Sequence, residues 1–196
     1  MPTFAGTLNV PPIGVTRVAA VTADGMVTAE AAADLNGAWT LQTEAAPEWI
    51  IASLSGRGVA AVATRPDDAA SLRFPPLMEL QLSFPDAPPH IPVSIDPIDL
   101  EAFPSDLHGA LTLHVQAIVN LHVATIPGEG TQRVQLQRGT YRISGRTFTL
   151  RPDFGETFVL DRIVDEESGA VLPATNGEVV VRVAKNAVFR AHFAQA

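Results

Sequence analysis

Residues 6–66 read GTLNVPPIGVTRVAAVTADGMVTAEAAADLNGAWTLQTEAAPEWIIASLSGRGVAAVATRP. Short apolar runs in this stretch are separated by the turn pairs Asp24-Gly25 and Asn36-Gly37 and by a turn at residues 55–58. Asp-Gly and Asn-Gly pairs accept the positive φ angles that tight hairpins need. The stretch therefore predicts short antiparallel strands joined by hairpins.

The rest of the chain keeps the same period of two. In residues 77–84, LMELQLSF, Met78, Leu80, Leu82 and Phe84 share one face. Residues 111–123, 131–137, 178–184 and 187–193 repeat this alternation, which is typical of half-buried strands. We count about twelve strands and two short helix candidates, residues 28–33 and 97–107. The pattern predicts an all-β protein built of antiparallel β-sandwiches, immunoglobulin-like or transthyretin-like, with very little helix.

Proline marks the clearest division of the chain. Residues 66–104 hold nine of the sixteen prolines. Proline cannot donate to a β-ladder, so it belongs at strand edges and in connections. We therefore expect a first sandwich domain over residues 1–65. A second, larger sandwich or barrel-like domain follows over residues 66–196, with 66–104 as its proline-rich entry.

Three motifs of the first 66 residues carry a family resemblance. They are an opening Gly6-Thr7-Leu8, the turn and strand Asp34–Leu41, and the strand Pro47–Ile51. Their order resembles the carboxypeptidase regulatory-like, or transthyretin-like, β-sandwich family over residues 5–66. The resemblance implies a scaffold without shared catalytic residues, with Trp39 and Trp49 filling one small core. Residues 134–143 resemble a strand entry of the same family, so the second domain is expected to be a further sandwich.

Composition restricts the possible functions. The chain has 196 residues, a net charge of −8 and no cysteine. An acidic protein lacks the basic surface that nonspecific nucleic-acid binding needs, and the missing thiols exclude disulfides and cysteine nucleophiles. The N-terminus lacks the features of a signal peptide, and no apolar run approaches the roughly 20 residues of a membrane span. We expect cytoplasmic synthesis, with the compartment left open, and incorporation into a particle or an exported assembly as one possibility.

The histidines do not form a metal motif. His114 and His122 share a predicted strand face but are about 26 Å apart at the rise of a strand. His90, His108 and His192 stand alone in the sequence. Asp96, Asp99, Glu101 and Asp106 form an acidic cluster, for which a solvated loop is favoured over a calcium site. We expect neither cofactor nor metal.

A run of arginines lies in the second half of the chain. Residues 133–151 contain no acidic residue. A solvated basic face, stacking on nucleic acid and contact with an acidic protein surface all fit such a run, and the acidic counterpart is at hand, because residues 66–110 carry a net charge of −7. The candidate interaction surface consists of Arg133, Arg138, Arg142, Arg146 and Arg151 together with Asp96, Asp99, Glu101 and Asp106.

The motifs favour an interaction protein over an enzyme. The chain has no G-x-S-x-G nucleophile motif and no phosphate-binding glycine loop. We expect a non-catalytic structural component of a multiprotein assembly, such as a phage-tail-like particle, a capsid or a surface structure. Its partners would be proteins, including further copies of the chain. A carbohydrate-binding accessory module is the alternative, and exposure of Trp39 or Trp49 would favour it. A hydrolase is the least supported of the three.

Overall fold

The computed structural model describes residues 1–9, 14–85, 91–104, 107, 124–145 and 158–195. Strands account for 64% of the structure and helices for 5%, which confirms the all-β sandwich class. The expected helix at residues 28–33 is wrong, because this segment is mostly strand β3, and the first residues of the 97–107 candidate belong to strand β8. Alanine-rich residues 27–32 form a strand because Ala29 and Ala31 on one face pack against the small core of the first half and Val27 packs against the large core.

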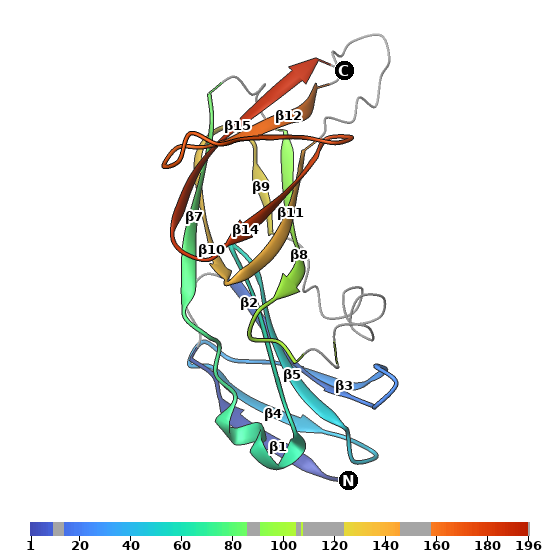
Figure 1. The fold of residues 1–196 in the computed structure, drawn as a ribbon. Coiled ribbons are helices and arrows are strands. Elements are labelled where there is room, and N and C mark those ends of the chain that lie inside the picture. The colour runs from blue at the N-terminus through green and yellow to red at the C-terminus, as the bar shows by residue number, and fades with distance from the viewer. Residues whose placement is uncertain (10–13, 86–90, 105–106, 108–123, 146–157, 196) are drawn as a thin grey trace.

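A long, nine-stranded sheet runs the length of the molecule (Figure 1). Its spatial order is β13 (Val171–Pro173), β12 (Phe158–Asp165), β15 (Ala187–Gln195), β7 (Leu77–Phe84), β10 (Gly130–Gln137), β6 (Gly58–Thr64), β5 (Trp49–Gly56), β2 (Gly14–Val21) and β3 (Val27–Ala32). Two smaller sheets accompany it. One pairs β1 (Thr3–Thr7) with β4 (Ala38–Gln42), and the other has the order β14 (Glu178–Val183), β11 (Gly139–Gly145), β8 (Pro92–Leu100) and β9 (Ala124–Pro127).

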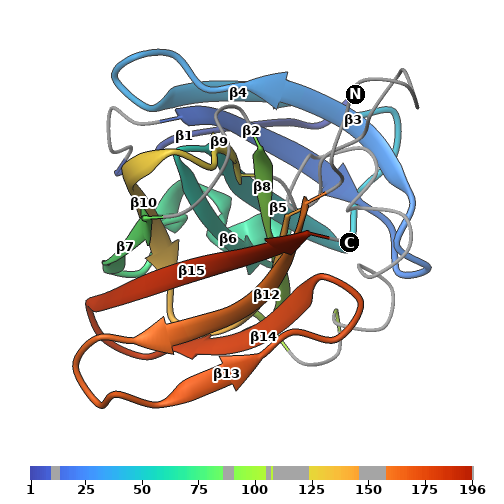
Figure 2. The same cartoon turned by 90° about the horizontal axis from the view of Figure 1, so that it is seen from above.

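Strands β2, β5 and β6 of the large sheet are buried on both faces over much of their length. On β2, Val18 and Ala20 belong to a small core with Trp39 and Leu41 of β4, whereas Ala19 and Val21 belong to the large core. Successive side chains of a strand point to opposite faces, so β1 and β4 cover one face of β2 and the large core covers the other. Figure 2 shows β1 and β4 lying along one side of β2 and β5. Burial on both sides explains the continuous apolar runs of β2, β5 and β6.

The large core fills the sandwich formed by the nine-stranded and four-stranded sheets. It lies between the nine-stranded sheet, which contributes Leu80, Leu82 and Val134 among others, and the four-stranded sheet. From the four-stranded sheet, β11 contributes Tyr141 and Ile143, and β14 contributes alternate valines. The sandwich is therefore closed by the inward-facing half of each alternating strand.

The two halves of the chain are joined rather than separated at Pro66. Strand β6 pairs in parallel with β10 through the partners Gln135↔Gly58 and Leu136↔Val59, which makes one sheet of both halves. The 3₁₀ helix η1 (Pro66–Ser71) is followed by Leu72 and Phe74, and both pack in the small core of the first half. The packing of the first half thus extends beyond residue 65, and a division into two domains stays a prediction.

The turn chemistry follows the sequence. Gly37 has a φ of 79°, and at the β13–β14 turn Asn176 and Gly177 have φ values of 54° and 79°. Glycine and asparagine adopt this left-handed region most readily. The Asn36-Gly37 turn is further held by Asp34, whose Oδ1 accepts hydrogen bonds from the backbone N–H groups of Asn36 and Ala38, both at 2.8 Å.

The expectation of one tryptophan core is half correct. Trp39 is buried in the small core, but Trp49 is half-buried and packs against the large core. The guanidinium carbon of Arg65 lies 3.8 Å from the centre of the Trp49 ring, and Arg65 also pairs with Glu48. Trp49 is the first residue of β5, at the end of the strand, which explains its partial exposure.

Candidate functional site

The four-stranded sheet brings several of the predicted surface residues together. Asp96 and Asp99 lie on β8, Glu101 follows that strand, and Arg142 lies on β11. Arg138 lies between β10 and β11, and Arg133 lies on β10 in the other sheet. Arg146, Arg151 and Asp106 lie outside the described residues, as do Asp86 and all histidines except His192.

Strand register places opposite charges side by side. Arg142 is the direct cross-strand partner of Asp96 on β8 and of Val180 on β14, and Thr140 is the partner of Asp99 and of Arg182. The inward residues Tyr141 and Ile143 are buried, so Thr140, Arg142 and Ser144 face outward. We name the outward-facing set Asp96, Asp99, Glu101, Arg142, Glu178 and Arg182 the charged face.

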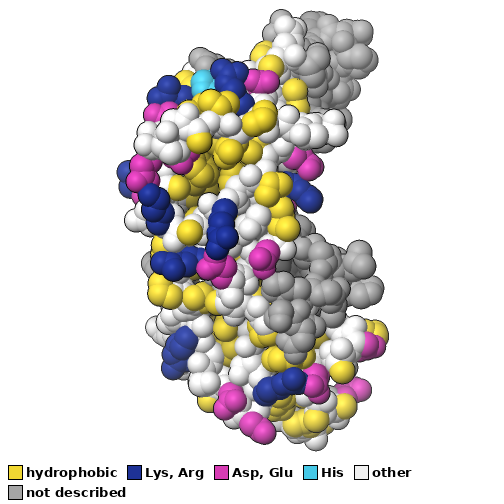
Figure 3. All heavy atoms as spheres, viewed as in Figure 1, with side chains coloured by type: hydrophobic (Ala, Val, Ile, Leu, Met, Phe, Trp, Pro, Cys, Tyr) yellow, Lys and Arg dark blue, Asp and Glu magenta, His cyan; other side chains and the backbone are white. Residues whose placement is uncertain are grey.

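Ion pairs within the chain connect this face. The Nε atom of Arg142 lies 3.4 Å from Oε2 of Glu178, and the Nη2 atom of Arg182 lies 2.7 Å from Oε1 of Glu101. About half of the Arg142 side chain and 72% of the Arg182 side chain remain exposed. Exposed pairs of this kind contribute about 0–1 kcal/mol each, so they organise the face more than they stabilise the fold. Figure 3 shows basic and acidic side chains interspersed over the molecular surface.

The pairing answers a question that the sequence left open. Acidic residues 66–110 and the arginine run meet within one chain, at Arg142 and Asp96, and Arg133 of β10 lies 4.0 Å from Glu79 of β7. Glu178 and Arg182 were absent from the predicted set. The sequence feature that could have identified them is the alternation in residues 178–183, EVVVRV. Glu178, Val180 and Arg182 alternate there with buried valines, and two of these three residues are charged.

Strand β14 is an edge of the four-stranded sheet. Among the described residues it pairs along its length with β11 alone. The turn before it closes with a bridge in which Thr175 and Glu178 exchange two backbone hydrogen bonds, of 2.9 and 3.1 Å. Beyond this bridge β13 joins the nine-stranded sheet and β14 joins the four-stranded sheet, so the two strands diverge.

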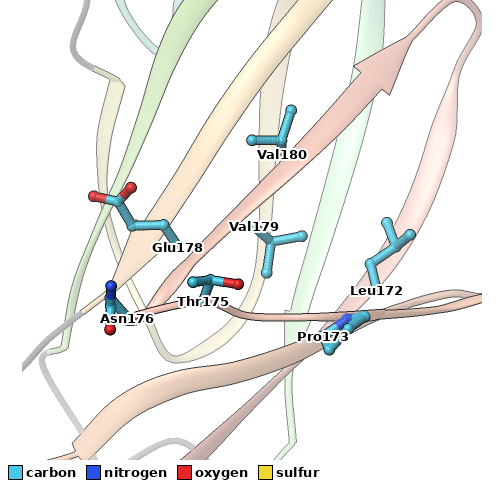
Figure 4. A pocket seen from close by; sticks show the side chains of 7 residues that line it. All are labelled: Leu172, Pro173, Thr175, Asn176, Glu178, Val179 and Val180. Atoms are coloured by element: carbon cyan, nitrogen blue, oxygen red, sulfur yellow. The ribbon is translucent and has the colours of Figure 1, made fainter.

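A hollow of about 530 Å³ opens where β13 and β14 diverge. Its wall combines apolar and polar side chains, and Figure 4 shows Val179 of β14 turned toward Leu172 of β13, with Pro173 beside Leu172 and Val180 pointing the other way. Thr175, Asn176 and Glu178 complete the lining at the turn. Val180 and Val171 are each 56% exposed. The hollow thus lies between the nine-stranded sheet and the four-stranded sheet, at the edge of the sandwich that they form.

The described residues contain no group of three or more His, Asp or Glu side chains arranged to hold a metal ion. Two groups there have displaced pKa values. Burial raises the pKa of Tyr141 well above its ordinary value, and hydrogen bonds from Ser168 and Glu167 lower the pKa of Asp165. Tyr141 points into the core and Asp165 organises an exposed turn, so both shifts have structural causes. No helix in this part of the chain is long and apolar enough to cross a membrane.

The two tryptophan side chains offer little for a sugar platform. Trp39 is 4% exposed, and Arg65 covers a face of Trp49. Sugar-binding platforms need an open aromatic face, so the geometry of these two residues does not favour the carbohydrate alternative.

Comparison with known proteins adds no family. No family model matches the chain, and no curated protein matches it. Among solved structures, the Bacillus anthracis TIE protein is similar at 8% sequence identity with a TM-score of 0.31. That match covers 99% of this chain and 34% of the other, so the chain spans about a third of the length of that protein. A likeness of this size carries no argument about function.

Proposed function

We propose that the chain is a non-catalytic structural component that assembles with protein partners, including further copies of itself. The observation that carries the proposal is the charged face. Both charge signs are gathered there in strand register on one exposed sheet surface, beside the exposed Val180. Alternating charges around apolar side chains suit a contact whose register must be specific.

Electrostatics would set the geometry of the contact, and apolar burial would supply most of its free energy. Each exposed ion pair contributes about 0–1 kcal/mol, but complementary charges steer encounter and reject wrong registers. Because Arg142 and Arg182 already pair with Glu178 and Glu101, a partner would extend these pairs into a network rather than neutralise isolated charges. Ile98, an exposed residue at the irregularity of β8, and Val180 supply the apolar part.

Sedimentation velocity tests the proposal. The purified 20.8 kDa chain should sediment as a larger species at low salt, alone or mixed with proteins encoded by adjacent genes, and should dissociate partly at 1 M salt, where the screening length falls to about 3 Å. Arg142→Glu combined with Arg182→Glu should weaken the assembly. Arg17→Glu is the control, since the exposure of Arg17 is similar to that of Arg142 and Arg17 forms an ion pair with Glu30 in the first half of the chain.

The outcomes separate the parts of the proposal. A monomer under every salt condition that sediments with none of these proteins would refute an assembly function. An assembly that survives the double arginine substitution would keep the assembly function and refute the role of the charged face.

A further inference from the structure

We propose that the free edge of β14 takes up an extended segment of a partner protein by strand addition, with an aliphatic side chain of that segment seated in the hollow between β13 and β14. The inference rests on the proposed interaction function and names the chemistry of the partner. It draws on the backbone of β14, the lining of the hollow and the charge at Arg182.

Among the described residues, no strand pairs with the outer hydrogen-bonding side of the β14 backbone. The N–H of Gly145 donates to the carbonyl of Gly177, which fixes the phase of the β11–β14 ladder. In an antiparallel ladder alternate residues exchange both bonds, so Val179, Val181 and Val183 face β11. Glu178, Val180 and Arg182 therefore point their N–H and C=O groups away from it. The backbone N–H and C=O groups of Glu178 are bonded to Thr175. Within the described residues, the corresponding groups of Val180 and Arg182 face the open edge of the sheet.

The side chains beside this edge fit an added strand. A residue opposite Val180 would lie on the outward face next to that exposed valine, because cross-strand partners share a face. The residues before and after it would point inward. One of them would enter the hollow against Leu172, Pro173 and Val179. An aliphatic side chain suits this wall because burial of apolar surface is the main source of favourable free energy there.

Charge selects the remaining position. Arg182 has a largely exposed side chain and bonds to Glu101 on its β8 side. A strand antiparallel to β14 would reach the residue opposite Arg182 first and those opposite Val181, Val180 and Val179 next. The partner segment is therefore an acidic residue followed by three residues of which the first and third are aliphatic, and like-charged residues opposite Arg182 would be disfavoured.

The same geometry argues against a second copy of β14 as the occupant. A two-fold pairing centred on Val180 would place Glu178 of each copy opposite Arg182 of the other. The backbone of Glu178 is already bridged to Thr175, and Thr175 stands in the space that the second strand would need. A segment of a different protein avoids this obstruction because it can end opposite Val179.

Nuclear magnetic resonance titration with a synthetic peptide tests the inference. The probe is the blocked pentapeptide Ser-Asp-Val-Val-Leu, which ends opposite Val179, added to the isotope-labelled full chain. We expect amide shifts centred on Val180 and Arg182, with Leu172 responding across the hollow. Replacing the second valine of the peptide, which would pair with Val180, by proline removes a donor and should weaken binding at least about fivefold. Replacing its aspartate by lysine should weaken binding up to about fivefold.

Two variants of the protein control for nonspecific binding. Val180→Lys should weaken binding by removing the apolar contact on the outward face, whereas Val15→Lys should leave it unchanged, since Val15 and Val180 are equally exposed valines. The proline peptide keeps the test decisive if Val180→Lys does not fold. Absence of shifts at Val180 and Arg182, or equal binding of the proline peptide, would overturn the inference. A peptide that fails on a chain that assembles refutes only the edge site, and a peptide that binds a strictly monomeric chain refutes only assembly between copies.

Discussion

The side-chain oxygen Oε1 of Gln137 accepts a hydrogen bond from the backbone N–H of Ala61 at 2.9 Å. These residues are 76 positions apart and belong to different halves of the chain. The parallel ladder of β6 and β10 includes Gly58 and Val59, and the side chain of Gln137 takes over as acceptor where the ladder ends. A glutamine amide thus replaces the backbone of a strand at the junction between the halves.

Gln137→Leu should destabilise the protein by about 1–3 kcal/mol, because it leaves the buried N–H of Ala61 without an acceptor. Gln135→Leu is the matched control, two residues earlier on the same strand and half-buried, and it should change stability by about 0.5 kcal/mol or less. Urea unfolding followed by circular dichroism measures both. Equal stability of the two variants would show that the Gln137–Ala61 bond does not hold the junction.

Both halves should unfold in one transition. The large core includes Ala19, Val21 and Ile51 of the first half together with strands of the second, so separating the halves would open the large core. Both tryptophans lie in the first half and the single tyrosine, Tyr141, lies in the second. Tryptophan fluorescence and tyrosine absorbance should therefore report coincident thermal midpoints. Two separated midpoints would mean that the halves are independent domains.

The sequence predicts local structure well wherever local chemistry decides it. Period-two alternation and the Asn-Gly turns identify most strands, since each depends on neighbouring residues alone. The β6–β10 and β7–β15 pairings are parallel and join distant segments, and no local pattern encodes them. The proline-rich stretch does not show where the packing of the first half ends, because Phe74 within it packs in the small core.

The candidate site was predicted in part for the same reason. Charge segregation pointed to Asp96 and Arg142, but only register shows that they are neighbours. Glu178 and Arg182 escaped prediction because isolated charges on an alternating strand occur on any solvated face. The free edge of β14 is a property of sheet order, which the sequence does not display.

The two tryptophans should differ in their contribution to stability. Trp39→Ala removes a side chain from the small core and should cost about 3–5 kcal/mol of unfolding free energy. Trp49→Ala should cost about 1–2 kcal/mol, because its ring is half-buried and its contact with Arg65 is near the surface. Urea unfolding compares them. Equal costs would mean that Trp49 is as firmly packed as Trp39.

Asp165 should ionise below its ordinary pKa of 3.8. Its carboxylate accepts hydrogen bonds from the Ser168 hydroxyl at 2.7 Å and from the Glu167 N–H at 2.9 Å, which favour the charged form. A depressed folded-state pKa stabilises the turn above the unfolded value, and this contribution is lost as the pH falls through the folded value. Carboxyl titration by nuclear magnetic resonance should show the depression, and Ser168→Ala should raise the pKa toward normal. An unchanged pKa in that variant would contradict the assignment.

Tyr141 should stay neutral until the protein unfolds at alkaline pH. Its side chain is fully buried, and its hydroxyl donates to the backbone carbonyl of Gln137, so burial raises its pKa above the ordinary value of 10.0. A phenol whose pKa is raised in the folded state stabilises the fold below the unfolded pKa, and this contribution is lost as the pH rises above about 10.

Because Tyr141 is the only tyrosine, the ultraviolet signal of tyrosinate belongs to it alone. Without denaturant, that signal should appear only at the pH at which the circular dichroism of the folded protein is lost. In concentrated urea, where the chain is already unfolded, it should appear with a pKa of about 10. Tyr141→Phe should remove the signal and cost about 0.5–1.5 kcal/mol through the lost hydrogen bond. Tyrosinate that forms near pH 10 while the sheets remain folded would show that this hydroxyl is open to solvent.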